Sequence, residues 1–413
     1  MPYQYDLLRN ETREVRKGMV SPLKGRLGKK VCLAVIMLAL VEGGLPAARA
    51  ADLTIPQPPE VSCDAALLME WHTGAVLFEK NGFKRMHPAS LTKMMTALVA
   101  LERGRLDDLV RVSYEAASQP GSTMYLKEGD VFTLEDLLFG LMLNSGNDAA
   151  WAIAEHIGKG SPEDFFQLMN SRAREIGAIN TRFKNPHGLT DPNHYTTAFD
   201  LALIARTCLK HPYFQRLVAT KEKDVIEAGK QVKISLYNTN RLLWLRPGAD
   251  GVKTGTTEAA GQCLVASATK DGMRLIVVIL DSQDRWSDAQ CLLDYGFSNY
   301  RLAKVASAGE TILTLPCIGS HEKYVPVQCL QDLSACVPRF AVGLRTEISL
   351  PRYVKGNCAR GTILGQANLY LGDRVVGYAD LVAGSWVNAR TPVGVLVRLA
   401  SSALKTLVSS GLF

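Results

Sequence analysis

The sequence lacks the usual signatures of a metal site. It contains no C-x-x-C pair, and its seven histidines show no ligand spacing. Structural zinc sites are built from such pairs, so we predict no structural metal and no cofactor. The nine cysteines are less informative. Cys32 lies in an apolar leader, and the other eight could pair outside the cell, although a chain of this size does not need disulfides to fold.

A strong charge excess is also missing. The 413 residues contain 47 Lys plus Arg and 40 Asp plus Glu, a net charge of +7. Residues 1–50 carry +5 of this, which leaves only +2 on the rest. A nearly neutral body with 47% hydrophobic and 21% charged residues argues against a nucleic-acid partner and against disorder. Its length is typical of two globular domains.

No apolar run is long enough to span a membrane as a helix. The longest, residues 31–41, has eleven residues, whereas a spanning helix needs about 20. It follows Lys29 and Lys30 and precedes the small-residue site 48–50. This pattern predicts a secretory signal peptide over residues 1–50, cleaved before Ala51. A retained membrane anchor is the alternative, and translation could also begin at Met19.

Within residues 51–300, strand patterns occur near the beginning and again after residue 250. Between them, apolar residues recur at helical spacing from 88 to about 213, and residues 284–300 are helical again. The strand-like runs are 65–71, 75–79, 251–256, 263–269 and 274–280, the last two joined at the hairpin signal Asp271-Gly272. We predict one domain over residues 51–300, an α/β protein of the α+β type with helices packed on an antiparallel sheet.

The pattern changes after residue 300. Short β-rich runs between Gly, Pro and Asn turns predict a small all-β domain over residues 301–390. In residues 391–413, polar side chains recur at helical spacing opposite Leu, Val and Ala. This predicts an amphipathic helix that lies on a membrane surface, with docking on its own protein as the alternative.

One serine-lysine pair has the setting of a nucleophile and its base. Ser-x-x-Lys occurs five times and is by itself uninformative, but Ser90 and Lys93 follow Pro88-Ala89 at the start of a predicted helix. Side chains three apart lie on the same helix face. A buried lysine can lose its proton and activate a serine hydroxyl. The helix N-terminus would add a backbone N–H for an oxyanion.

Two further motifs follow in the order that such a site needs. Ser145 and Asn147 form the only Ser-x-Asn of the chain, and the strand motif Lys253-Thr254-Gly255, followed by Thr256, is also unique. Taken singly, these residues read as helix caps or a solvated strand. Helix caps have no reason to fall in this set and order, so together they favour a serine penicillin-binding enzyme.

These segments resemble the low-molecular-mass penicillin-binding proteins, the serine D-alanyl-D-alanine carboxypeptidases of the peptidase S11 type. The similarity covers about residues 60–300 and is carried by 87–96, 141–149 and 250–255, with support from 121–124, 185–189 and 264–268. It implies a β-lactamase or penicillin-binding transpeptidase-like fold. The β domain and the tail fit this family by architecture rather than by motif.

The resemblance also implies residue roles. Ser90 would attack the peptide bond between the last two D-alanines of a peptidoglycan stem peptide, with Lys93 as base. Ser145 and Asn147 would assist proton transfer and orientation. The second group, Lys253, Thr254, Gly255 and Thr256, would bind the substrate, with backbone N–H groups of Ser90 and Thr256 as the oxyanion hole. β-Lactam antibiotics would acylate the same serine, at the outer face of the cytoplasmic membrane.

Three other functions remain compatible with these motifs. A serine β-lactamase shares them, but no Glu motif for rapid deacylation lies between Ser145 and Lys253. A non-catalytic wall-binding or antibiotic-sensing module would not need all the motif residues, which are Ser90, Lys93, Ser145, Asn147 and Lys253. Transpeptidation differs only in that an amine, rather than water, takes the acyl group from the enzyme. His187 is expected to shape a loop rather than to act as a base, and Arg241 is a weak candidate for the carboxylate because some relatives carry Arg where Thr239 stands here.

Overall fold

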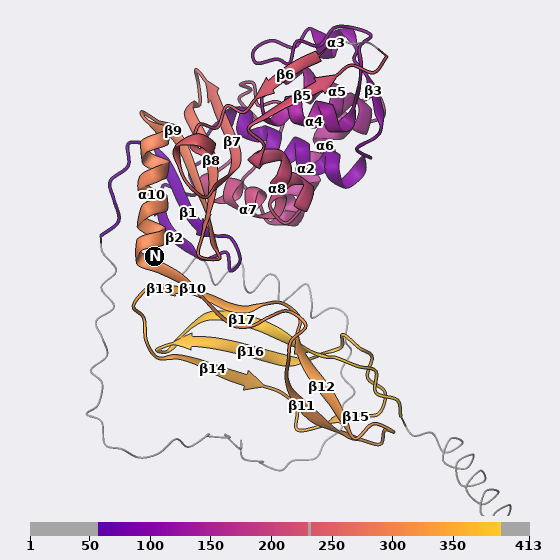
Figure 1. Ribbon diagram of the computed structural model, residues 1–413, viewed down its shortest axis with the longest axis vertical. Coiled ribbons are helices and arrows are strands. Elements are labelled where there is room, and N and C mark those ends of the chain that lie inside the picture. Colours follow the sequence, from indigo (N-terminus) through magenta and orange to yellow (C-terminus); the bar gives the residue numbers. More distant parts are fainter. Residues whose placement is uncertain (1–56, 230–232, 390–413) are drawn as a thin grey trace, which may run out of the picture. The chain divides into compact units, whose positions relative to one another are not determined.

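The computed structural model describes residues 57–229 and 233–389. A five-stranded antiparallel sheet with the order β2-β1-β9-β8-β7 organises the first part (Figure 1). Its strands are β1 (Ala65–Glu70), β2 (Val76–Lys80), β7 (Ala249–Thr257), β8 (Gly261–Lys270) and β9 (Met273–Ser282). The predicted sheet, which joins distant parts of the chain, is therefore confirmed.

The sheet is buried on both faces. In β1, Ala65, Leu67 and Met69 belong to one core cluster, and Ala66 and Leu68 belong to the other. Successive side chains of a strand point to opposite faces. Burial of both faces explains why β1, β8 and β9 read as almost continuous apolar runs rather than as alternating ones.

A helical block covers one face of the sheet. It contains α2 (Lys93–Arg103), α3 (Tyr114–Ala117), α4 (Leu134–Met142), α5 (Asn147–Ile157), α6 (Pro162–Ile176), α7 (Ala198–Cys208) and α8 (Pro212–Ala219). The short helix α9 (Leu242–Leu245) instead contributes Leu242 to the core on the opposite face. Several starts are capped by a side-chain oxygen that accepts a backbone N–H, as Thr133 does for Asp136 and Thr197 does for Asp200. Gly177, with φ +90°, ends α6 in the left-handed conformation that favours glycine.

The opposite face is covered by α10 (Arg285–Asn299), which lies beside the sheet in Figure 1. The Asp284 side chain caps it by accepting from the N–H groups of Trp286 and Ser287. The hairpin between β8 and β9 turns at Asp271 and Gly272, both with positive φ. Both elements were predicted from the sequence.

Two short strand pairs interrupt the region that the sequence predicts as helical or leaves unassigned. They are β3 (Leu109–Arg111) with β4 (Val131–Thr133), and β5 (Glu222–Ile226) with β6 (Lys233–Tyr237). The long region predicted as helical, residues 88 to about 213, contains the first pair, which the prediction did not include. Three-residue strands are too short to show a period of two, and β5 and β6 are mostly exposed and polar.

From residue 300 to 389 the described structure consists of strands, as predicted. A six-stranded sheet has the order β14-β16-β17-β12-β11-β15, and β10 pairs with β13. The strands are β10 (Tyr300–Ala306), β11 (Thr311–Ile318), β12 (Tyr324–Cys329), β13 (Leu333–Pro338), β14 (Leu344–Ser349), β15 (Val354–Lys355), β16 (Ile363–Leu371) and β17 (Arg374–Ala383). They enclose an apolar core of their own.

The predicted signal peptide (1–50) and the predicted amphipathic helix (391–413) lie outside the described residues. Among the helices that are described, none has the length and apolar content needed to cross a membrane.

Candidate active site

Ser90 and Lys93 lie at the junction of a short 3-10 turn and helix α2. The turn, Ala89–Thr92, begins at a residue with φ +48°, and α2 follows at Lys93. The helix thus starts slightly later than Ser90. The Lys93 amine lies 3.0 Å from the Ser90 hydroxyl and is hydrogen-bonded to it. The sequence spacing therefore brings nucleophile and base candidates into direct contact.

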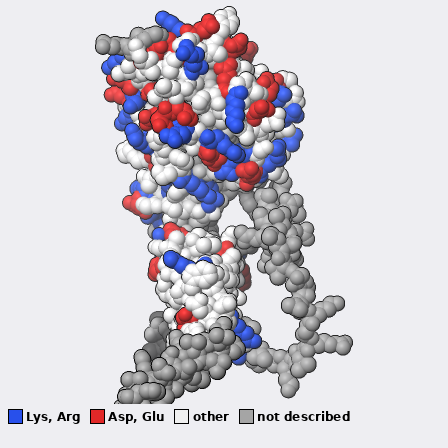
Figure 2. Space-filling model, turned by 90° about the vertical axis from the view of Figure 1, so that its right-hand side faces the viewer, with Lys and Arg blue, Asp and Glu red and all other residues white. Residues whose placement is uncertain are grey.

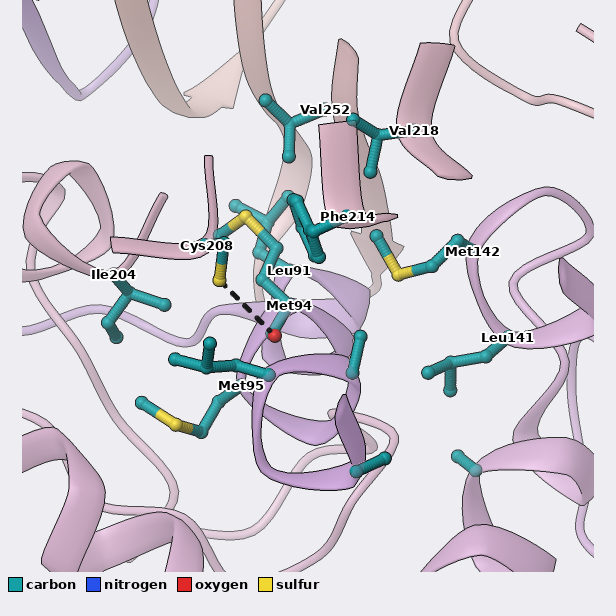
Figure 3. Packing of buried hydrophobic residues seen from close by; sticks show 14 of the residues in the cluster. Leu91, Met94, Met95, Leu141, Met142, Ile204, Cys208, Phe214, Val218 and Val252 are labelled. Carbon is teal, nitrogen blue, oxygen red and sulfur yellow. Dashed lines mark hydrogen bonds between the residues drawn. The ribbon is translucent and has the colours of Figure 1, made fainter. Parts of the chain in front are cut away.

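The helix that carries this pair is fixed by apolar packing (Figure 3). Leu91 and Met94 are fully buried, and the Sγ of Cys208 on α7 contacts the Met94 carbonyl at 3.5 Å. Close packing of this kind restrains a helix to one position. The Ser90 hydroxyl is consequently presented from a rigid base.

Lys93 is fully buried among polar acceptors. Its amine donates to Asn147 Oδ1 at 2.7 Å and to the carbonyl of His187 at 2.9 Å. Burial and the nearby charge of Lys253 hold the pKa of Lys93 well below its usual value, and the Asp148 carboxylate acts in the opposite direction. A lysine in this environment can lose its proton and become a base.

The second predicted motif lies at the start of α5. The Asn147 side chain accepts from Lys93 through its oxygen and donates through Nδ2 to the Pro120 carbonyl at 2.5 Å. Ser145 has φ +61° and is only 6% exposed. Within the described part of the chain, its buried hydroxyl has no hydrogen-bond partner, so it is free to bond a substrate atom.

The Lys-Thr-Gly motif lies on the edge strand β7. The Lys253 amine donates to the Thr254 carbonyl at 3.1 Å, and burial together with the charge of Arg285 lowers the pKa of Lys253 to about 7. The Thr254 hydroxyl is 2.7 Å from that of Thr239. These hydroxyl and amine groups form a polar strip along the end of the sheet.

Gly255 allows β7 to approach the nucleophile. A Cβ at this position would come within 3.1 Å of the backbone nitrogen of Ser90 and of the Pro88 carbonyl. Both are backbone atoms that cannot rotate away. A side chain here would push strand and turn apart by a few tenths of an ångström, so glycine favours their close approach.

Arg285 is a site residue that the sequence reasoning missed. From the first turn of α10, its Nη1 donates to the Gly255 carbonyl at 3.0 Å and to the Thr256 hydroxyl at 2.9 Å. No motif or spacing marks it in the sequence, since the sheet fold alone brings α10 next to β7. It adds a positive charge to the strand that carries Lys253.

Two other candidates are not brought into this group as chemical participants. His187 is buried with both ring nitrogens bonded: Nε2 to Gln119 Oε1 at 3.0 Å, and Nδ1 to the Leu189 N–H at 3.2 Å. Burial lowers its pKa to about 3, so the ring is neutral. Arg241 is exposed and makes no side-chain hydrogen bond to the described motif residues, although its positive charge adds to burial in lowering the pKa of Arg285. Among the described residues, no group of His, Cys, Asp or Glu could hold a metal ion.

A buried Ser–Lys pair, a second serine with an asparagine, and a Lys-Thr-Gly edge strand define a serine acyl-transfer enzyme. Residues 52–284 match the D-alanyl-D-alanine carboxypeptidase family, peptidase S11, and residues 300–389 match the C-terminal domain of penicillin-binding protein 5. The chain therefore belongs to the D-alanyl-D-alanine carboxypeptidase family. Its predicted function as a serine hydrolase of that specificity is confirmed.

Curated relatives and solved structures agree with this family. The chain is 39% identical to D-alanyl-D-alanine carboxypeptidase DacF of Bacillus subtilis over 278 residues, which covers 65% of this chain and 71% of that protein. It is 32% identical to DacD of Salmonella typhimurium over 86% of this chain and 94% of that protein. Penicillin-binding protein 5 from Haemophilus influenzae superposes with a TM-score of 0.70 at 32% identity, covering 81% and 99% of the two chains.

A shorter relative matches the first part alone. A DD-transpeptidase from Streptomyces K15 aligns with a TM-score of 0.56 at 34% identity, covering 58% of this chain and 99% of that chain. The same fold thus occurs in proteins named for hydrolysis and in one named for transpeptidation.

Proposed function

We propose that Ser90 is the nucleophile and Lys93 the general base in removal of the terminal D-alanine from peptidoglycan stem pentapeptides. The arrangement of acceptors around Lys93 carries this proposal. Asn147 Oδ1 and the His187 carbonyl can only accept, and they take two amine hydrogens. A neutral amine has two hydrogens and one lone pair, which is then left for the proton of the Ser90 hydroxyl 3.0 Å away.

Acylation then follows in one sequence of bond changes. The Ser90 oxygen bonds to the carbonyl carbon between the last two D-alanines while its proton passes to Lys93. The carbon–nitrogen bond breaks as the Ser145 hydroxyl gives its proton to the leaving amine and takes up the proton that Lys93 removed from Ser90. The buried and unpartnered state of that hydroxyl supports the relay. Backbone N–H groups of Ser90 and Thr256 stabilise the developing oxyanion.

Substrate selection depends on the free carboxylate of the last D-alanine. Thr254 and Lys253 on β7 offer a hydroxyl and an amine for it, and Thr256 lies on the same strand next to Arg285. A carboxylate is bound best by such charged and hydroxyl donors together. We assign these residues, with Gly255 as the spacer, to substrate binding.

Water then hydrolyses the acyl-enzyme and frees both Ser90 and the shortened peptide. A β-lactam ring opened by Ser90 would remain attached, because its leaving group stays tethered to the acyl product. The enzyme is therefore expected to bind penicillin covalently and to trim the cell wall. The alternatives of a β-lactamase, a transpeptidase or a non-catalytic sensor differ in what happens to this acyl-enzyme.

We also propose export and membrane association. The basic and apolar pattern of residues 1–50 supports secretion across the cytoplasmic membrane. The amphipathic pattern of 391–413 supports attachment to its outer face. Deletion of 395–413 should release the mature protein into the soluble fraction, whereas membrane association that persists would exclude the tail as the anchor.

The deciding experiment measures two products in parallel. Purified residues 51–413 receive a peptide ending in D-alanyl-D-alanine, and free D-alanine is quantified while a fluorescent penicillin labels the protein. We expect D-alanine release and long-lived labelling, both abolished in Ser90→Ala. Ser320→Ala is the matched control, since Ser320 also precedes a lysine by three residues but lies in the β region.

Other outcomes identify the alternatives. Label that decays within seconds without D-alanine release would indicate a β-lactamase. Stable label without release would indicate a transpeptidase or a sensor. Label retained by Ser90→Ala would refute the assignment of the nucleophile.

A further inference from the structure

One buried carboxylate next to the site has no role in the chemistry proposed above. Asp148 follows Asn147 in the first turn of α5 and is 1% exposed. A buried carboxylate is retained only where donors or cations compensate for its removal from water. Its partners therefore indicate what it does.

The adjacent Ala149 N–H donates to Oδ1 at 2.8 Å, and the other partners come from the loop 120–126. The Met124 N–H donates to both carboxylate oxygens at 3.1 Å, and the Leu126 N–H donates to Oδ2 at 3.1 Å. The Thr123 hydroxyl makes a further short hydrogen bond to Oδ2. One side chain thus binds two backbone N–H groups and one hydroxyl of the loop.

The same loop holds the neighbouring asparagine. The Ser122 carbonyl accepts from the backbone N–H of Asn147 at 2.7 Å, and the Pro120 carbonyl accepts from its Nδ2 at 2.5 Å. An amide with its nitrogen held by a carbonyl must present its oxygen in the other direction. That oxygen is the one that accepts from Lys93.

Packing leaves the loop little room to find another position. Met124 is fully buried, and a Cβ on Gly140 of α4 would come within 2.1 Å of its sulfur. A Cβ on Gly146 would lie 2.7 Å from Asp148 Oδ1. The two glycines therefore permit the close contact of α4, the loop and the carboxylate.

Charge gives Asp148 a second effect on Lys93. The charged groups that act on the Lys93 amine are Lys253 from β7 and Asp148 from α5. His187, from the loop that supplies a carbonyl to Lys93, is neutral because its pKa is lowered to about 3. Asp148 is thus the negative charge that opposes Lys253 at this position.

We propose that Asp148 is a positioning residue, which clamps the loop 120–126 to α5, keeps the Asn147 amide oxygen on Lys93 and opposes the charge of Lys253 at the Lys93 amine. The proposal rests on Lys93 being the base. It extends that assignment because it identifies a residue that touches neither the substrate nor the reacting atoms.

The test compares the pH profile of penicillin acylation in Asp148→Asn with that of the wild type. An amide cannot accept from all of these donors, and its nitrogen would face N–H groups, so the plateau rate should fall roughly tenfold. The acidic limb, which reports the base of the free enzyme, should move to lower pH because the negative charge is gone. A merely structural residue would not move that limb.

Two further variants separate the effects. Thr123→Val removes one donor but keeps the charge, so it should lower the plateau and leave the limb in place, with faster amide exchange at residues 120–126. Asp164→Asn removes an exposed carboxylate from the first turn of α6 and should change neither. It is the matched control for charge.

An unmoved limb in a folded Asp148→Asn protein overturns the proposal. If that protein does not fold, Thr123→Val decides, and wild-type exchange and rate in this variant overturn it. Ser90→Ala is run alongside: label retained there would refute the proposed nucleophile itself, whereas label lost there and an unmoved limb in Asp148→Asn would refute only the role of Asp148.

Discussion

The two described regions differ in what they bury. Residues 57–299 bury charged side chains, among them Lys93, Asp148 and Lys253, each at most 1% exposed. Between 300 and 389 the buried polar side chains of the described structure are Ser320 and Ser334, and none is charged. Both regions nevertheless have full apolar cores.

The surface differs in the same direction on the face shown in Figure 2. Basic and acidic side chains are interspersed over the first region, whereas the β region presents mostly uncharged residues. Buried ionisable groups destabilise a fold unless they are neutralised or paired. These buried ionisable groups are concentrated around Ser90. This indicates that the first region is less stable than it could be because its site needs them, whereas the β region carries no such cost.

The largest effect is expected from removing the base. Lys93→Met should reduce acylation by penicillin roughly 10²–10⁴-fold, the range that general base catalysis contributes. Methionine has a similar length and removes a buried amine, but it leaves Asn147 Oδ1 and the His187 carbonyl without this donor, so the two effects on stability oppose each other and the melting temperature should change little. Stopped-flow labelling and thermal unfolding test both parts, and a large loss of stability would contradict the trade between stability and chemistry.

Truncation of one buried leucine in each region should separate the effects on stability from those on acylation. Leu369→Ala, in the fully buried core of the β region, should cost about 2–5 kcal/mol of unfolding free energy and change the acylation rate less than about twofold. Leu91→Ala, equally buried (Figure 3) but adjacent to Ser90 in the chain, should reduce both stability and acylation. Equal losses of activity in the two variants would show that the regions are not separable in this way.

The last effect, the smallest for each step measured, is a pH dependence of stability. The pKa of Lys253 is about 7 in the folded protein and about 10.4 in an unfolded chain. Between these values the unfolded chain binds the extra proton, so the free energy of unfolding rises with pH by up to about 1.4 kcal/mol per unit. Below pH 7 both states hold the proton and this contribution is absent.

Urea denaturation from pH 7 to 10 measures this slope. Lys253→Met should lose part of it relative to the wild type, since the group that titrates is gone. The exposed residue Lys270 supplies the control Lys270→Met, which should follow the wild-type slope. Parallel curves for wild type and Lys253→Met would show that Lys253 titrates alike in both states.

Patterns in the sequence predicted those helices, strands and turns whose formation depends mainly on neighbouring residues. The hairpin at Asp271-Gly272, the helix after Asp284 and the strand with Lys253 each depend on neighbouring residues for turn chemistry, capping or apolar run length. The short pairs β3–β4 and β5–β6 could not be found in this way, because they are too brief or too exposed to show a period.

The sequence predicted which residue types form the site. It said much less about the side chains and charges that surround them. The order Ser90-Lys93, Ser145-Asn147, Lys253-Thr254-Gly255 is a property of the sequence, and it sufficed to indicate the chemistry and the family. Arg285 and Asp148 carry no such signal, since their importance comes from contacts with β7 and with the loop 120–126.

The sequence by itself determined which groups could react and in which elements they would lie. Only the tertiary structure decided that Lys93 can act as a base, because its pKa falls through loss of water and through the charge of Lys253, a residue from a distant strand. Desolvation and charge proximity are properties of three-dimensional packing, and no residue pattern along a single chain contains them.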